Sequence, residues 1–220
     1  MLGQKFEGVF LISGKLATKS FAPNSRVYDE RTIKMDNTEY RFWDPQKSKA
    51  SAAILKGLRQ MPIRKGTKVL YLGAGSGTTA SHFSDIVEDG KIYCVEFAPR
   101  SMRDLIRTCE RRKNMLPILA DARRPETYQK FIQDADVIYQ DVAQPDQAKI
   151  LINNSRMFLK KDSLAMIAVK SQCIDVVREP SEVYKELIEE LEKNNFEVLD
   201  KMDLFPFDKD HLFILLRYKG

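Results

Sequence analysis

The sequence predicts an α/β fold, a doubly wound and mostly parallel sheet of seven strands that ends in an antiparallel hairpin. From residue 68 onward, short apolar runs alternate with segments of helical periodicity, which is typical of a parallel sheet covered on both faces. The first of these runs, VLYL at 69–72, stops at the glycine cluster GAGSG. The last two runs are joined by a loop too short for a crossover helix, so they must pair antiparallel.

The N-terminal residues 1–43 predict a small antiparallel β module. Short strands are expected at Glu7–Ile12, Thr32–Met35 and 40–43, separated by turn residues. Residues 44–220 then form the main domain, because a module of this size has little core of its own.

The main domain opens with a predicted helix over Lys47–Gln60, where apolar residues recur with helical spacing. Parallel strands are predicted at 68–72, 91–97, 116–120, 135–141 and 163–169. Helices are predicted around 79–87, 100–113, 124–132 and 144–158, and an amphipathic helix at 181–193. The antiparallel strands are 196–204 and 211–218.

Composition indicates a globular protein, with 43% apolar and 30% charged residues. No apolar run approaches the roughly 20 residues that cross a bilayer, and we expect neither a signal peptide nor membrane association. The three cysteines Cys94, Cys109 and Cys173 are isolated, which argues against a disulfide framework and a zinc site. We therefore expect no metal site, a reducing compartment and a cytoplasmic location.

The net charge of +5 is compatible with an RNA partner without requiring one. The strongest local bias is a basic cluster in and after the predicted helix 100–113. A solvated helix face and a nucleic-acid patch are equally good interpretations of it. Its members are Arg100, Arg103, Arg107, Arg111, Arg112, Lys113, Arg123 and Arg124.

The glycine cluster excludes two common ligand loops. A phosphate loop requires a lysine after its last glycine, and Thr78 follows Gly77 here. A nicotinamide loop requires G-x-G-x-x-G/A, and although Gly73 and Gly75 fit, the third position falls on Thr78. The loop is therefore G-x-G-x-G at the end of a buried strand.

Acidic residues follow three successive strands of the predicted sheet. Glu96 ends the second strand, where it can accept from the ribose hydroxyls of an adenosine. Asp121 follows the third strand, within reach of an adenine amino group, and Asp141 follows the fourth, facing a cationic methionine moiety. Three acids without a phosphate-binding lysine favour a cationic adenosine ligand, S-adenosylmethionine.

Three ionisable residues are expected at the same edge of the sheet, where ligands of such folds bind. Asp141 is one, Lys170 ends the fifth strand, and His211 begins the last, antiparallel strand. A lysine amine beside a second cation loses proton affinity and can act as a base on a ribose hydroxyl. Lys49, in the helix before the first strand, could point either way.

Seven segments of the sequence resemble fibrillarin, in its archaeal fibrillarin-like form. They are EGVF, EYRFWDPQKSKASAAIL, VLYLGAGSGTTASHFSDIV, VEFAPRSMRDL, DVAQPDQAKI, VKSQCID and PFDKDH. Eukaryotic members carry a Gly/Arg-rich N-terminal extension that these residues lack, which favours the archaeal form. The family loop usually reads GAASGTT; Gly75 departs from it, and we expect a looser backbone there and retained function.

The resemblance implies a Rossmann-like class I methyltransferase fold and a guide-RNA-directed ribose 2′-O-methyltransferase of ribosomal and transfer RNA. The family works in a box C/D ribonucleoprotein with a Nop-domain scaffold protein and a kink-turn-binding ribosomal-type protein. Its catalytic set falls on Lys49, Asp141, Lys170 and His211. The cofactor-binding set, with the glycine loop, comprises Gly73, Gly75, Gly77, Thr78, Thr79, Glu96, Phe97, Asp121, Ala122, Asp141, Val142, Ala143 and Gln144.

We hypothesise that Lys170 is the general base and that Asp141 holds Lys170 and the methionine amino group. Lys49 would favour the neutral amine of Lys170 or bind the target phosphate, and His211 would position the ribose. The N-terminal module and its junction near Trp43 are candidates for scaffold contact or for simple core packing. Two alternatives remain: a stand-alone or protein (glutamine) methyltransferase, and a mainly structural subunit of the ribonucleoprotein.

Overall fold

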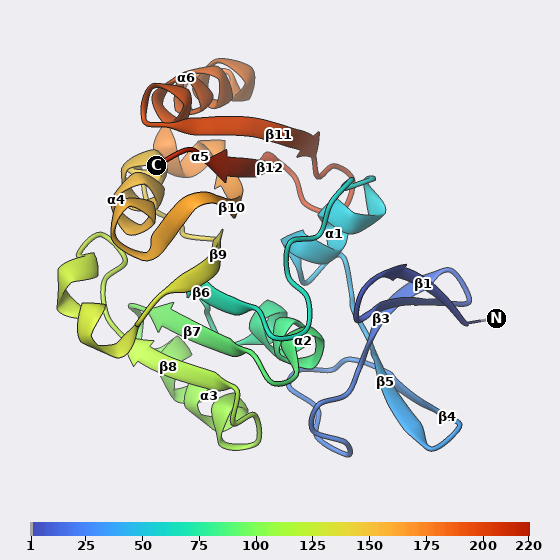
Figure 1. Cartoon of the computed structure of the whole chain (residues 1–220). Helices are drawn as coiled ribbons and strands as arrows, with labels where there is room; N and C mark the ends of the chain where they lie inside the picture. Colours follow the sequence, from blue (N-terminus) through green and yellow to red (C-terminus); the bar gives the residue numbers. More distant parts are fainter. Residues whose placement is uncertain (1) are drawn as a thin grey trace.

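The computed structural model of the chain describes residues 2–220, so Met1 of the predicted N-terminal module lies outside the described residues. Two sheets make up the fold, one of five strands and one of seven (Figure 1). None of the helices in residues 2–220 has the length and apolar character that a membrane span requires.

The main sheet has the seven strands that were predicted, and the structure adds their order, β11-β12-β10-β9-β6-β7-β8. Its strands β6 to β10 pair in parallel, and β12 runs antiparallel to both β10 and β11. The predicted fold class is therefore confirmed. The strands are β6 (Lys68–Leu72), β7 (Lys91–Glu96), β8 (Met115–Leu119), β9 (Ala135–Gln140), β10 (Leu159–Lys170), β11 (Phe196–Asp203) and β12 (His211–Tyr218).

Helices cover both faces of this sheet because successive strand residues alternate between two apolar cores. One face packs against α1 (Lys49–Leu55), α2 (Thr78–Val87) and α3 (Pro99–Glu110), through Phe83 and Leu105 among others. The other face packs against α4 (Gln147–Phe158) and α6 (Pro180–Lys193), through Leu151 and Leu187. In Figure 1 these two groups of helices lie on opposite sides of the strands.

Several predicted boundaries were wrong. The predicted helix 47–60 is helical only over Lys49–Leu55. The predicted helix 124–132 is two short 3₁₀ turns, Pro125–Thr127 and Gln129–Phe131. Pro125 starts the first turn, and Tyr128 and Ile132 are both buried, so the segment folds inward too tightly for a regular helix. A short helix α5 (Ser171–Ile174) directly after β10 was not predicted.

The N-terminal sheet has five strands where three were predicted, in the order β1-β2-β3-β5-β4. The predicted strand at Glu7–Ile12 begins only at Val9, because Glu7 and Gly8 form a turn in which Gly8 has a φ of +73°. The strands are β1 (Leu2–Phe6), β2 (Val9–Ile12), β3 (Lys15–Lys19), β4 (Thr32–Met35) and β5 (Thr38–Phe42). The division of the chain between residues 43 and 44 stays a prediction.

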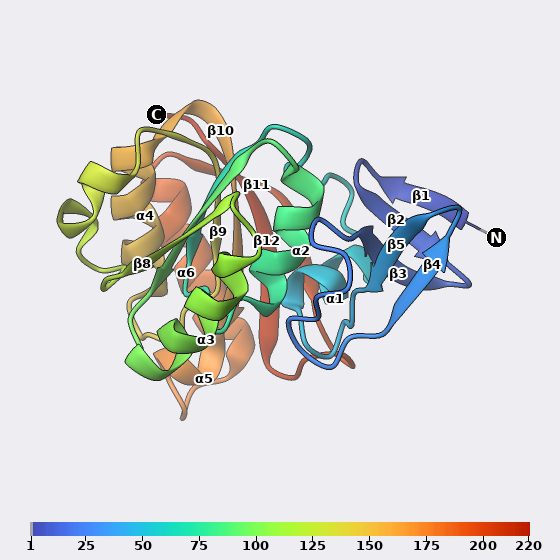
Figure 2. The same ribbon diagram turned by 90° about the horizontal axis from the view of Figure 1, so that it is seen from below.

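The N-terminal sheet lies beside α1 and α2, away from α4 and α6 (Figure 2). Trp43 follows β5, is 1% exposed, and stacks on the His82 ring of α2 at a centroid distance of 5.0 Å. Of the two roles considered for Trp43, core packing is the one that the structure supports.

A buried charged cluster joins the N-terminal sheet to α2 and to the end of α3. It comprises Glu30, Arg41, Asp85 and Arg112, whose side chains are at most 1% exposed. Arg41 binds Glu30 and Asp85, each at 2.7 Å, and Arg112 binds Asp85 at 2.6 Å. Two guanidinium groups and two carboxylates balance in charge, which is what burial of ions requires.

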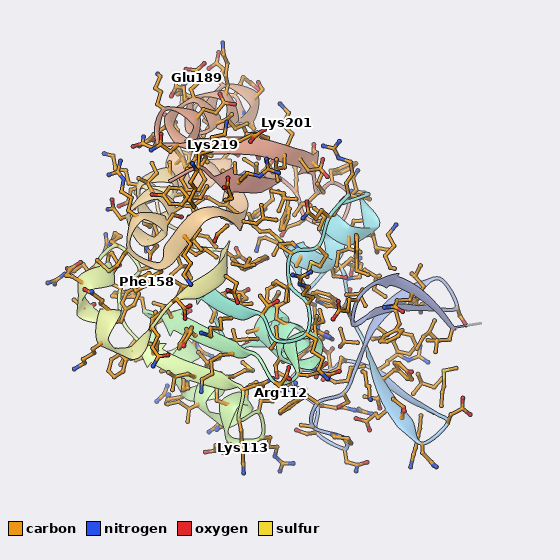
Figure 3. The ribbon with its side chains drawn as sticks, viewed as in Figure 1. Arg112, Lys113, Phe158, Glu189, Lys201 and Lys219 are labelled. Carbon is orange, nitrogen blue, oxygen red and sulfur yellow. The ribbon has the colours of Figure 1, made fainter. Side chains whose placement is uncertain are left out.

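Arg112 thus differs from the rest of the basic cluster singled out in the sequence. The other members of that cluster are exposed, whereas the Arg112 side chain is buried. In Figure 3, Arg112 lies where α2 meets the N-terminal segments, while the neighbouring Lys113 lies at the outer end of α3. Arg112 therefore has a structural role, and it belongs neither to a solvated helix face nor to a nucleic-acid patch.

Candidate functional site

The glycine loop begins at the end of β6 and meets the loop after β9. Gly73 has a φ of +80°, and a Cβ atom at this position would lie 2.3 Å from the carbonyl oxygen of Asp141. Only glycine permits so close an approach of two backbones. The loop then enters α2 at Thr78, and Thr79 donates its hydroxyl proton to Ser48 Oγ at 2.9 Å, which connects the glycine loop to the N-cap of α1.

Glu96, the last residue of β7, binds the glycine loop directly. Its Oε2 accepts from the Gly75 amide at 2.7 Å, and its Oε1 accepts from the Ala98 amide at 2.7 Å. Each carboxylate oxygen has a second lone pair, so the predicted bond to ribose hydroxyls remains chemically available. The two amides fix the orientation of a side chain that is only 9% exposed.

Asp121 follows β8 and has a partner that the sequence did not reveal. The Arg123 side chain binds it through Nε at 3.0 Å and through Nη2 at 2.6 Å. The hydrogen bond from this guanidinium holds the pKa of the Asp121 carboxyl below its usual value. Asp121 is therefore an ionised acceptor at neutral pH, as a bond from an adenine amino group would require.

The remaining predicted cofactor residues surround these acids at the same edge of the sheet. Phe97 is 61% exposed, an unusual state for a phenylalanine directly after a buried strand. Ala122 and Val142, which directly follow Asp121 and Asp141 in the chain, are each 9% exposed. Ala143 and Gln144 continue the loop after Asp141 and are exposed and half-buried, respectively.

Three of the four predicted catalytic residues connect through one row of charges. Lys49, the first residue of α1, places its Nζ 3.0 Å from Asp141 Oδ2 and 3.8 Å from Asp208 Oδ2. Asp208 Oδ1 in turn lies 2.9 Å from Nδ1 of His211. The row Asp141–Lys49–Asp208–His211, here called the edge row, lies along the ends of β9 and β12.

Lys170 lies beside the edge row, and its ammonium has no recorded ion pair within residues 2–220. It is the last residue of β10 and pairs in register with His211, the first residue of β12. Directly paired residues of an antiparallel ladder project from the same face, with Cβ atoms about 4.5–5.5 Å apart. Asp141 binds Lys49 in this structure, whereas our hypothesis had assigned it to Lys170.

A buried glutamine holds the backbone of Lys170. Gln147 Oε1 accepts from the Lys170 amide at 3.2 Å, and Gln147 Nε2 donates to the Lys170 carbonyl at 3.1 Å. The pairing of β10 with β9 has already ended at Ile167, so this side-chain amide replaces a neighbouring strand. Lys170 is therefore held at a fixed position on both sides of its strand.

Sequence reasoning missed Asp208, Gln147 and Arg123. The spacing Asp208-x-x-His211 is a usable signal, because an acid three residues before a histidine can reach its ring across a tight turn. Gln147 carries no comparable signal, since its role depends on where β9 stops pairing. Arg123 lies two residues after Asp121, and the sequence shows the two charges without their bidentate geometry.

A hollow at the opposite edge of the sheet is separate from this site. It has a volume of about 490 Å³ and is lined by residues of 60–67, 136–137 and 162–164, among them Arg64, Lys65 and Asp136. No predicted site residue lines it.

Comparison with known proteins identifies the family to which the chain belongs. The family model for Fibrillarin matches residues 2–220. A fibrillarin-like rRNA/tRNA 2′-O-methyltransferase of Methanococcus voltae is 47% identical, and the match covers 99% of this chain and 97% of that protein.

Solved structures agree in fold and in sequence. Aeropyrum pernix fibrillarin, in complex with natively bound S-adenosyl-L-methionine, superposes with a TM-score of 0.92 at 45% identity, covering 98% of this chain and 97% of that one. The fibrillarin chain of a fibrillarin/Nop5p complex superposes with a TM-score of 0.89 at 39% identity, covering 97% and 98%. The chain belongs to the fibrillarin family.

Proposed function

We propose that this methyltransferase transfers a methyl group from S-adenosylmethionine to ribose 2′-hydroxyls of ribosomal and transfer RNA, directed by a guide RNA in a box C/D ribonucleoprotein. The observation that carries the proposal is the meeting of two sets of residues at one sheet edge. The glycine loop with Glu96 lies next to Asp141, and Asp141 begins the edge row that ends beside Lys170.

The residues of this chain suit S-adenosylmethionine. The absence of a side chain at Gly73 keeps open the approach between the glycine loop and Asp141. Glu96 accepts from the ribose, Asp121 from the adenine amino group, and Phe97 contributes an exposed ring. The cationic methionine end is complemented by Asp141, whose Oδ2 is bonded to Lys49, while its Oδ1 has no side-chain partner within residues 2–220.

Lys170 acts as the general base in this mechanism. Its unprotonated amine accepts the proton of the ribose 2′-hydroxyl as the oxygen attacks, since a hydroxyl is a weak nucleophile until that proton leaves. When bound, S-adenosylmethionine supplies a methyl group already activated on a positively charged sulfur. The remaining task of the protein is to align oxygen and methyl carbon, and the fixed backbone of Lys170 serves that alignment.

His211 and Lys49 position the RNA in this scheme. His211 lies next to Lys170 in the ladder and is 7% exposed, so one edge of its ring can meet the ribose. Lys49 is bonded to Asp141 and partly exposed, which allows it to bind the target phosphate as well. These assignments rest on the edge row together with the resemblance of PFDKDH and VKSQCID to the family.

The partners we propose are a Nop-domain scaffold, a kink-turn-binding protein and the guide RNA. Support for the scaffold comes from the relative that forms a complex with Nop5p. Base pairing to a guide would supply sequence specificity, so the protein itself needs only a modest positive charge, as its net charge of +5 provides. We place the enzyme in the cytoplasm, where its three free cysteines stay reduced.

Label transfer from S-adenosylmethionine to target RNA tests the proposal, with digestion to locate the methyl group. The protein is tested alone, then with guide RNA and both partner proteins. We expect methylation of one ribose and only in the assembled particle. Transfer without a guide would indicate a stand-alone enzyme, including one that methylates protein glutamine. Donor binding without transfer in either case would indicate a mainly structural subunit.

A further inference from the structure

The loop between β11 and β12 brings an acid into the edge row that the proposed mechanism does not yet use. Asp208 is 32% exposed and lies between two predicted catalytic residues, Lys49 and His211. Its two oxygens face different partners, Oδ2 toward Lys49 at 3.8 Å and Oδ1 toward His211 at 2.9 Å. One carboxylate therefore contacts two elements, α1 and β12, that are far apart in the chain.

The contacts of the His211 ring determine which nitrogen carries the proton. Nδ1 lies 2.9 Å from Asp208 Oδ1 and 2.9 Å from the carbonyl oxygen of Lys209. An ionised carboxylate and a carbonyl can only accept hydrogen bonds, so Nδ1 must carry the proton. Nε2 has no recorded hydrogen-bond partner within residues 2–220, and in the neutral ring it keeps its lone pair.

We propose that Asp208 is a positioning residue, which keeps His211 in the Nδ1–H form with Nε2 available to the ribose and which holds Lys49 beside Asp141. This inference rests on the proposed function, because it assigns His211 and Lys49 to the RNA. Asp208 touches neither the ribose nor the methyl group; it acts through His211, which meets the ribose, and through Lys49, which binds the target phosphate. The alternating signs of Asp141, Lys49 and Asp208 keep the row together at an edge open to water.

The ring proton can be observed directly by ¹⁵N NMR of labelled histidine, well above the ordinary histidine pKa. The chain has only two histidines, so a His211→Gln variant assigns both signals. We expect His211 in the Nδ1–H form, and a shift toward Nε2–H in Asp208→Asn. His82 lies outside the edge row and serves as the internal control, unchanged in both proteins. A His211 ring in the Nε2–H form, or one unaffected by Asp208→Asn, would overturn the inference.

Kinetics in the assembled particle test the consequence for the reaction. We expect Asp208→Asn to lower kcat about 10- to 100-fold, because a charge-assisted hydrogen bond is lost. The donor affinity and the melting temperature should stay at the wild-type values, and Asp208→Glu should recover part of kcat. Asp210→Asn removes the same charge two residues away and should leave kcat unchanged.

Adding Asp208→Asn to a double-variant background separates a positioning role of Asp208 from a role in loop structure. If Asp208 acts through His211 and Lys49, Asp208→Asn should add little to the loss in a His211→Ala, Lys49→Ala background. Full additivity, or a wild-type kcat in Asp208→Asn, would overturn the inference. Failure of wild-type protein to methylate RNA would instead reject the proposed function, while the NMR result on the free protein would still stand.

Discussion

Two clusters of opposite charges in this molecule differ in how deeply they are buried and in whether an unpaired charge lies beside them. In the buried cluster of Glu30, Arg41, Asp85 and Arg112, every group has an opposite charge within 2.7 Å, and the side chains are at most 1% exposed. In the edge row, the side chains of Lys49, Asp141 and Asp208 are 22–32% exposed, and the neighbouring Lys170 forms no ion pair with any residue of the described range 2–220.

We infer from this difference that the buried cluster serves the stability of the fold and that the edge row serves the reaction. Buried ions need complete pairing because an unpaired charge in a dry interior is strongly destabilising. Ions at a water-exposed edge tolerate incomplete pairing, which leaves an amine free to exchange a proton. We therefore expect substitutions in the buried cluster to affect unfolding, and substitutions at the edge to affect methyl transfer.

The largest expected effect on stability is that of Asp85→Ala. Among residues 2–220, Asp85 is the one carboxylate that pairs with Arg112, and it also accepts from Thr18 and from the Phe21 amide. Its removal leaves a buried guanidinium unpaired and should lower the free energy of unfolding by about 3–5 kcal/mol. Chemical denaturation measures this loss.

Asp104→Ala is the matched control for that experiment. Asp104 pairs with Arg107 on the exposed face of α3, and its removal should change the free energy of unfolding by less than about 0.5 kcal/mol. Equal losses for Asp85→Ala and Asp104→Ala would remove the distinction between buried and exposed pairs.

Acidification should destabilise the junction between the N-terminal sheet and α2, because the His82 ring is buried there. Its burial lowers the pKa of the imidazole well below 6.5, so below that pH the unfolded state binds more protons than the folded state. The free energy of unfolding should thus fall by about 1 kcal/mol more in wild type than in His82→Gln between about pH 6.5 and 5.5. Parallel pH curves for the two proteins would contradict the prediction.

Gly75→Ala restores the residue usual in the family. The loss of stability expected from it is similar to, or smaller than, the loss expected from acidification through His82. Gly75 has a φ of +57°, in the left-handed region, although a Cβ atom there would meet no other atom. Alanine in this conformation should cost about 1 kcal/mol in the free energy of unfolding. Unchanged stability would mean that the loop relaxes, as the sequence-based expectation of a looser backbone implies.

The sheet could be predicted from sequence because its signals are local. Apolar runs such as Val69–Leu72 and 163–169 mark buried strands, and the short loop before His211 requires a hairpin. The N-terminal strands were harder, since Glu7 and Gly8 read as part of one strand when a left-handed glycine actually turns the chain. The segment after Arg124 was misread because its compact turns depend on burial of Tyr128.

The positions of the candidate site residues could also be predicted, whereas their pairings could not. Strand ends fix where Asp141, Lys170 and His211 lie, because parallel strands share one edge. Which carboxylate binds which lysine depends on side-chain geometry within a few ångströms. The sequence thus led to an Asp141–Lys170 contact, whereas the structure has Asp141 bonded to Lys49 and adds Asp208.

Methyl transfer by Lys170→Ala in the assembled particle tests the central claim most directly, with donor affinity and melting temperature measured on the same protein. Lys201→Ala, an exposed lysine on β11 (Figure 3), is the control and should behave as wild type. The account predicts a loss of about 10²- to 10⁴-fold in the rate for Lys170→Ala, with donor binding and folding retained. Transfer at the wild-type rate would contradict the assignment of the base and with it the separation between the two clusters.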